Sequence, residues 1–150
     1  MDNTKLKHIK AQCICDLRTY LREPTVRADI EAIDPRLWQY VTDATSPLEH
    51  YVLPLDDEGT EVEDCIASLH ELLCIRKNLR KWCTYTLDTD YAQRWLRAIE
   101  GVWTQREDGT WQHVSGGVKF DTPQGARHVR LMPFQVWFVV TTMLFQTEVD

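Results

Sequence analysis

The sequence predicts a mainly α-helical protein in which one small β-hairpin region, at about residues 103–131, interrupts a series of amphipathic helices. Apolar side chains recur at spacings of three and four along most of the chain, which is the period of a helix with one buried face. The pair Asp108-Gly109 is a strong signal for a tight turn between two strands. The 150 residues, 43% of them hydrophobic and 27% charged, suffice for one globular core. We therefore expect a single helical domain over residues 1–150.

Three helices are expected first. Residues 4–22 place apolar side chains at helical spacing with lysines on the opposite face, and Pro24 ends this helix. A short second helix follows Pro24. The pair Asp34-Pro35 is typical of an N-cap followed by a first-turn proline, so a third helix is expected over 35–43.

The stretch 47–59 is expected to be irregular, because it contains prolines and ends in an acidic run. Thr60 and Glu63 have the form of a capping box, which predicts a long amphipathic helix from Thr60 to about Cys83. The acids around this start lack the alternating ligands of a calcium loop. We interpret them as solvated side chains at a helix N-terminus, and expect no metal site.

Asp88 is a good cap for the next helix, which Gly101 ends. The hairpin about Asp108-Gly109 is expected to comprise residues 103–114. A second pair of short strands, 118–120 and 128–131, flanks a turn-like segment.

The most apolar stretch of the chain is 129–146, and Pro133 suits the first turn of a helix there. On that helix one apolar face would comprise Phe134, Trp137, Phe138, Thr141, Leu144 and Phe145. Gln135 would lie on a narrower polar stripe. The run 139–142 is rich in β-branched residues, so a buried strand stays open as an alternative. The stretch is too short to span a bilayer.

The net charge of −6 would repel a phosphate backbone, so binding to DNA requires a local basic face. The candidates are the cations near the end of the long helix and on the helix after it: Arg76, Lys77, Arg80, Lys81, Arg94 and Arg97. Compensation of the helix dipole explains the first four equally well. The five cysteines form no CxxC pair, which indicates reduced thiols in a cytoplasmic compartment.

The last apolar stretch resembles the start of the ATPase motor in the large subunit of tailed-phage terminases. Those proteins have Leu-x-Pro-(Trp/Phe)-Gln before an apolar helix, and Leu131, Pro133, Phe134 and Gln135 stand at these positions here. Leu144-Phe145 matches a further pair that is frequent in the family, although Gln146 then replaces the usual Gly.

Upstream segments follow the same family order over about residues 70–146. A basic turn, a Tyr-x-Leu-Asp stretch and a helix with a hydrophobic-Ile-Glu ending match Arg76–Arg80, Tyr85–Asp88 and Ala92–Glu100. The segment 103–128 is longer than the family usually has. Residues 1–69 match no motif of the family.

The resemblance implies the N-terminal helical part of a P-loop ATPase-type motor that packages DNA in a bacterial host cell. ATP with Mg would be the cofactor of the complete protein, and no cofactor is expected to bind tightly to this chain alone. The small terminase subunit, the portal and double-stranded DNA would be the partners of the complete protein. Gln135 would read adenine, with Pro133 and Phe134 beside it, because a carboxamide matches the N6 donor and N7 acceptor of that base. The sequence contains no G-x-x-x-x-G-K-(S/T), so we expect an N-terminal fragment that is inactive by itself.

Two other functions stay open. One is a stand-alone helical protein-interaction module, which could also self-associate through exposed apolar surface. The other is the N-terminal part of a helicase-type ATPase, which uses a similar glutamine motif. A gene that continues into a phosphate loop would favour an ATPase over the interaction module.

Overall fold

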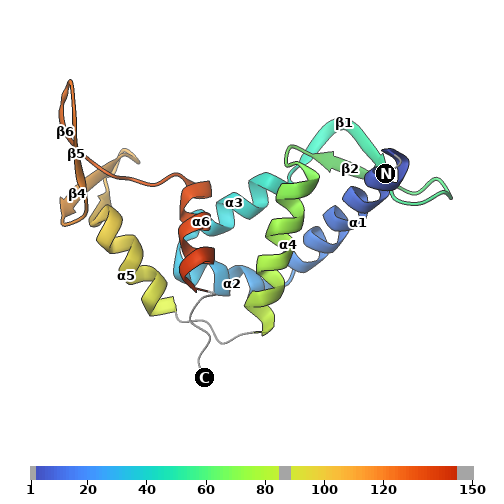
Figure 1. Ribbon diagram of the computed structural model, residues 1–150, viewed down its shortest axis with the longest axis horizontal. Coiled ribbons are helices and arrows are strands. Elements are labelled where there is room, and N and C mark those ends of the chain that lie inside the picture. Colours follow the sequence, from blue (N-terminus) through green and yellow to red (C-terminus); the bar gives the residue numbers. More distant parts are fainter. Residues whose placement is uncertain (1–2, 85–88, 145–150) are drawn as a thin grey trace. The chain divides into compact units, whose positions relative to one another are not determined.

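The computed structural model describes residues 3–84 and 89–144, and for 82–84 and 143–144 it describes the backbone only. In these ranges the chain forms six helices and three antiparallel sheets of two strands each (Figure 1), which confirms a mainly helical protein. The chain divides into two compact units, Met1–Tyr85 and Thr86–Asp150, where the sequence indicated no internal boundary. We refer to them as unit 1 and unit 2.

Unit 1 begins with the three predicted helices. These are α1 (Asn3–Leu21), α2 (Pro24–Ile33) and α3 (Pro35–Thr45), and a later helix of the same unit is α4 (Leu69–Thr84). The expected cap of α3 is present, because a carboxylate oxygen of Asp34 accepts the N–H of Arg36 at 2.9 Å. Pro35 occupies the first turn, where its missing N–H costs no hydrogen bond.

Between α3 and α4 the structure contains a hairpin that the sequence analysis missed. Strands β1 (Pro47–Pro54) and β2 (Glu61–Cys65) pair antiparallel. The predictions of an irregular 47–59 and of a helix beginning at Thr60 are therefore wrong.

Local hydrogen bonds explain this difference. The carboxylate of Asp56 accepts the N–H groups of Glu58 at 2.9 Å and Thr60 at 3.2 Å, which closes the turn between the strands. The helix begins later, at Leu69, where the hydroxyl of Ser68 accepts the N–H of Glu71 at 3.2 Å. Ser68 thus has the capping role that the sequence analysis assigned to Thr60.

The core of unit 1 lies between α1 and the elements that pack on it, α2, α3, α4 and the β1–β2 hairpin. Its fully or almost fully buried side chains include Cys13, Ile14, Leu17, Ile30, Leu37, Val41, Leu72 and Ile75. Arg18 of α1 joins α3 and the β1–β2 hairpin to α1 by hydrogen bonds. Its guanidinium donates to the carbonyl oxygen of Thr45 at 3.0 Å and to that of Glu63 at 2.8 Å.

Unit 2 comprises α5 (Thr89–Glu100), α6 (Pro133–Leu144) and two hairpins between them. The strands are β3 (Val102–Gln105), β4 (Trp111–Ser115), β5 (Lys119–Thr122) and β6 (Gly125–His128). The first hairpin is confirmed, with the side chain of Asp108 accepting the N–H of Thr110 at 3.0 Å. In the second, the predicted strand 128–131 is wrong, because β6 ends at His128.

Glycines allow the hairpins to approach the end of α5 closely. Gly101 has a φ of 73°, and a Cβ there would collide with the carbonyl oxygen of Ser115. A Cβ at Gly117 would collide with the carbonyl group of Glu100. The N–H of Val118 donates to the carbonyl oxygen of Ile99 at 2.9 Å, so the backbones are joined directly.

The segment 133–144 is a helix, α6, so the strand alternative is excluded. It packs on α5 and buries Val136, Trp137 and Val140. The expected apolar face is therefore partly wrong, because Phe134 is 57% exposed and Phe138 is 69% exposed. The proposed cap Asp88 and the proposed match at Phe145 lie outside the described residues.

None of the helices in the described ranges has the length and apolar character needed to cross a membrane.

Candidate functional site

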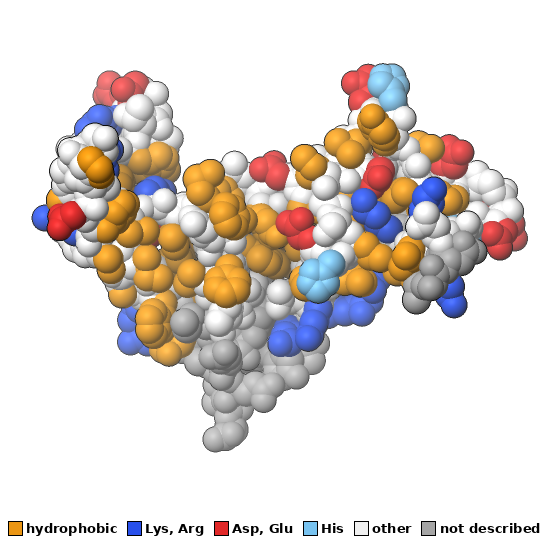
Figure 2. All heavy atoms as spheres, turned by 45° about the horizontal axis from the view of Figure 1, so that its top comes forward, with side chains coloured by type: hydrophobic (Ala, Val, Ile, Leu, Met, Phe, Trp, Pro, Cys, Tyr) orange, Lys and Arg blue, Asp and Glu red, His pale blue; other side chains and the backbone are white. Residues whose placement is uncertain are grey.

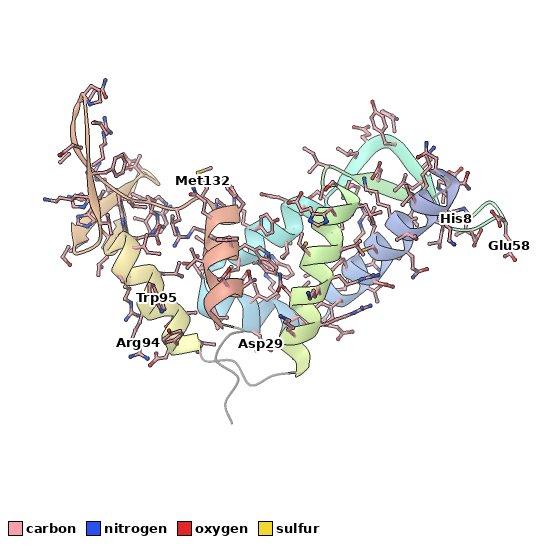
Figure 3. All side chains as sticks on the ribbon, in the orientation of Figure 1. His8, Asp29, Glu58, Arg94, Trp95 and Met132 are labelled. Carbon is pink, nitrogen blue, oxygen red and sulfur yellow. The ribbon has the colours of Figure 1, made fainter. Side chains whose placement is uncertain are left out.

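The start of α6 holds the three residues that the sequence analysis grouped, Pro133, Phe134 and Gln135. Met132, labelled in Figure 3, precedes the helix, and its carbonyl oxygen accepts the N–H of Gln135 at 2.9 Å. Pro133 occupies the first helical position. Gln135 is therefore the third residue of the helix and is half-buried beside the exposed ring of Phe134.

The side chain of Gln135 folds back onto the residue before the helix. Its Oε1 accepts the N–H of Met132 at 2.8 Å. This is one half of a capping box, in which the third helical residue binds the N–H of the cap residue. Because only the oxygen of a carboxamide accepts a hydrogen bond from an N–H, this contact determines which way the amide faces.

The capping bond leaves Gln135 with unused hydrogen-bonding capacity. A carboxamide oxygen has two lone pairs, of which Met132 uses one. Within the described part of the chain, no hydrogen bond occupies Nε2 of Gln135. An acceptor and two donors thus lie side by side at the start of α6.

Glu100, the last residue of α5, anchors the segment that leads into α6. Its side chain is 4% exposed, and Oε2 accepts the N–H of Leu131 at 2.6 Å. Nη1 of Arg130 lies 3.9 Å from Oε1 of the same carboxylate. The buried charge thus has both a hydrogen-bond donor and an opposite charge.

Two tryptophans of the first hairpin hold Arg130 in place. The guanidinium carbon lies 4.2 Å from the ring centroid of Trp111 and 5.7 Å from that of Trp103. Trp103 in turn donates its indole N–H to the carbonyl oxygen of Glu100 at 2.7 Å. Arg130 is therefore a structural link between the β3–β4 hairpin and the start of α6, through cation–π and ionic contacts.

A stacked histidine pair continues this cluster. The rings of His113 and His128 lie 3.4 Å apart between centroids at an angle of 8°. Burial lowers the pKa of His128 below its usual value, and the charges of His113 and Lys119 lower it further. The environment of His128 therefore favours its neutral form.

The candidate DNA-binding cations of α4 differ in their surroundings. Arg76 is half-buried and forms an ion pair with Asp16 of α1, with 3.0 Å between Nη1 and Oδ2. Lys77 and Arg80 are exposed, and Lys81 is half-buried. Arg76 therefore contributes to packing between α1 and α4.

Arg94 and Arg97, the candidates on α5, are both exposed. Arg94 lies over the ring of Tyr91, with 5.9 Å from the guanidinium carbon to the ring centroid. Figure 3 labels Arg94 and the partly exposed Trp95 on this helix. These cations belong to unit 2, whereas those of α4 belong to unit 1.

Large apolar side chains are exposed on both units (Figure 2). Those of unit 2 are Trp95, Val102, Trp111, Val114, Val118, Phe120, Met132, Phe134 and Phe138. Unit 1 exposes Tyr51, Val52 and Ile66. Among the residues that the structure describes, more of these exposed side chains therefore lie on unit 2 than on unit 1.

The anchoring role of Glu100 was not predicted from the sequence. The signal was present, because Ala92, Leu96 and Glu100 follow one another at intervals of four and form the buried side of α5. An acid at the end of an apolar stripe requires a partner in the folded protein. Its partners, Arg130 and the N–H of Leu131, could not be read from that helix.

No group of three or more His, Cys, Asp or Glu side chains in the described ranges has an arrangement that could hold a metal ion.

Comparisons of the chain with protein-family models, with curated proteins and with solved structures find no match.

Proposed function

We propose that this chain is the N-terminal region of the large subunit of a phage terminase, and that Gln135 reads the adenine of ATP. The observation that carries the proposal is the hydrogen bond of 2.8 Å that holds the Gln135 amide at the start of α6. It joins the family motif of Leu131, Pro133, Phe134 and Gln135 to a side-chain geometry that suits the base.

The geometry fits adenine in three respects. The free lone pair of Oε1 can accept from the N6 amino group, while Nε2 donates to N7. Phe134, which is exposed next to Gln135, supplies a ring on which a base can stack. The residues present here therefore contact the base, and ATP would supply the phosphoanhydride bond whose hydrolysis drives a motor of this kind.

The orientation of the amide also predicts a preference for adenine over guanine. Guanine presents two acceptors, O6 and N7, on the corresponding edge. Nε2 would have to turn toward O6 to bind it, and this rotation would break the bond from Met132 to Oε1. Adenine can therefore pair with both groups of the amide while the capping bond is kept, whereas guanine offers no donor to Oε1.

In this proposal the protein acts in the cytoplasm of a bacterial host with double-stranded DNA, the small terminase subunit and the portal as partners. The exposed cations Lys77, Arg80, Arg94 and Arg97 are the DNA-contacting residues. Attraction to phosphate at these positions must overcome the net charge of −6.

The test is an NMR titration of the 150-residue chain with ATP and with GTP. The side-chain amide signals of Gln135 should shift with ATP and much less with GTP. Gln135→Glu is the matched variant, since it keeps the acceptor for Met132 but removes the donor to N7. Equal shifts with both nucleotides would remove the claim. So would an ATP response of the backbone amides of Phe134 and Val136 that Gln135→Glu leaves unchanged.

A second candidate function is a protein-interaction module, favoured by the exposure of Phe134 at 57% and of Phe138 at 69%. Analytical ultracentrifugation separates the two. Self-association or partner binding that Phe138→Ser abolishes, without any response to ATP, would support the module. A helicase-type ATPase predicts the same response of Gln135 and differs in its DNA reaction, which is strand separation rather than packaging.

A further inference from the structure

We infer that Glu100 is a positioning residue for the base-reading amide, acting on Gln135 through Leu131 and Met132. This inference rests on the proposed function and deepens it, because it names the residue that sets the preference for adenine. Glu100 does not touch the nucleotide. It holds the segment from which Met132 orients the Gln135 side chain.

The restraint begins with the buried contact of Glu100. Its carboxylate comes from the end of α5 and binds the N–H of Leu131 at 2.6 Å, from a side chain that is 4% exposed. A carboxylate that accepts from a backbone N–H forms a short and strong hydrogen bond. The backbone at Leu131 is thus attached to a packed helix.

The restraint on Leu131 extends to Met132 through the backbone. The N–H groups of these residues belong to consecutive planar peptide units. The two units are joined at the Leu131 Cα, where only the angles φ and ψ can rotate. The Glu100 carboxylate holds the first unit, and Oε1 of Gln135 accepts the N–H of the second at 2.8 Å. Movement at Leu131 therefore changes the direction of the N–H that orients Gln135.

Glu100 also restrains this segment through its negative charge. Oε1 of Glu100 lies 3.9 Å from Nη1 of Arg130, and the rings of Trp103 and Trp111 hold that guanidinium. Residues 130 and 131 are consecutive, so the carboxylate binds the segment at both a side chain and a backbone group. This double attachment restricts rotation of the segment more than either contact alone.

The experiment measures two quantities on the 150-residue chain. The first, without nucleotide, is the hydrogen-exchange rate of the Met132 amide. The second is the ratio of the dissociation constants for GTP and ATP, taken from the shifts of the backbone amides of Phe134 and Val136, which every variant retains. The variants are Glu100→Ala, Glu100→Gln, Gln135→Ala and the double variant of Glu100→Ala with Gln135→Ala. Glu107→Ala is the control, since it removes an exposed acid of unit 2.

We expect Glu100→Ala to speed exchange at Met132 several-fold and to bring the GTP/ATP ratio from at least about fivefold to near unity. Glu100→Gln should retain most of the ratio, because its amide oxygen still accepts from Leu131. The double variant should have a GTP/ATP ratio no lower than that of Gln135→Ala, since both changes act through the side-chain amide of Gln135. Glu107→Ala should behave as wild type.

The outcomes distinguish failure of the inference from failure of the proposed function. If Glu100→Ala unfolds the chain, Glu100→Gln and Glu100→Asp test the inference in its place. Glu100→Asp has a shorter side chain that reaches the N–H of Leu131 less well, so it should lower the GTP/ATP ratio. Glu100→Gln should keep the ratio. A ratio that survives loss of the carboxylate contact overturns the inference and leaves the proposed function standing. A wild-type chain without preference for ATP overturns the proposed function, and with it the inference.

Discussion

Gln135 and Met132 form a local capping contact in which the side-chain oxygen of the first accepts the backbone N–H of the second at 2.8 Å. The contact stabilises the start of α6, as a glutamine at the third helical position commonly does. The same contact determines which face of the amide is free. A structural role and the proposed base-reading role are therefore compatible in one side chain, and variants must be chosen to separate them.

Arg18 should be a main determinant of stability in unit 1. Arg18→Met keeps much of the aliphatic stem but leaves the carbonyl oxygens of Thr45 and Glu63 without their charged donor. We expect a loss of about 1.5–3 kcal/mol in the free energy of unfolding, measured by urea denaturation. Arg22→Met is the control, because Arg22 is exposed. Equal stability of the two variants would contradict the role assigned to Arg18.

The stability of unit 2 should fall in mild acid because of His128. Its pKa is lowered in the folded protein, chiefly by burial, so the unfolded chain binds a proton more readily. The stabilising contribution is therefore complete above the unfolded value of about 6.5 and is lost as the pH falls below it toward the folded pKa.

Urea midpoints between about pH 7.5 and 5 test this expectation. His128→Gln should remove part of the decline in acid, whereas His50→Gln should not, since the side chain of His50 is 85% exposed. A pH profile that is identical in wild type and His128→Gln would refute the role of His128. His113 stacks on His128 and lowers its pKa, so His113→Gln should also flatten the profile.

Any binding to duplex DNA should be weak and sensitive to salt. The exposed residues Lys77, Arg80, Arg94 and Arg97 each contribute about −0.9 to the slope of log K against log salt when they meet a phosphate. Lys77→Ala should therefore reduce the slope by about one. Fluorescence anisotropy with labelled DNA over a salt series measures it.

Arg76 provides the contrast in this series. Its guanidinium pairs with Asp16 at 3.0 Å, so Arg76→Ala should lower stability more than it lowers affinity for DNA. Tight binding that does not respond to salt, or a larger effect of Arg76 than of Lys77 on the slope, would refute the assignment of these cations.

The sequence predicted the elements whose signals are local. Asp34-Pro35, Asp108-Gly109 and Pro133 each act through the backbone within a few residues, and the structure places a helix start, a hairpin turn and a helix start there. The pattern of Thr60 and Glu63 was misleading. Asp56 accepts the N–H of Thr60 and closes a turn, and Glu61–Cys65 continues as strand β2, so no helix begins at Thr60.

The sequence predicted only those residues of the candidate site that are neighbours in the chain. Pro133, Phe134 and Gln135 lie together because they are consecutive at a helix start. Glu100 and Leu131 are 31 residues apart in the chain, and their hydrogen bond depends on the approach of two segments. The exposure of Phe138 likewise depends on which side of α6 packs on α5, and helical spacing alone does not determine this.

The sharpest prediction concerns a longer protein in which this segment precedes a phosphate loop. Gln135→Ala should raise the KM for ATP there by roughly 5- to 150-fold, because one bidentate base contact contributes about 1–3 kcal/mol. Turnover of GTP should change much less, since guanine offers no donor to Oε1 on that edge.

Gln135→Glu distinguishes this effect from a defect in the helix. It retains an acceptor for the Met132 N–H, and a carboxylate in the first turn also interacts favourably with the helix dipole. The fold should therefore keep its stability while the KM for ATP still rises, because the donor to N7 is absent. If instead Gln135→Glu matches wild type in ATP turnover and Gln135→Ala loses stability, then Gln135 is a helix cap alone and the base-reading role is wrong.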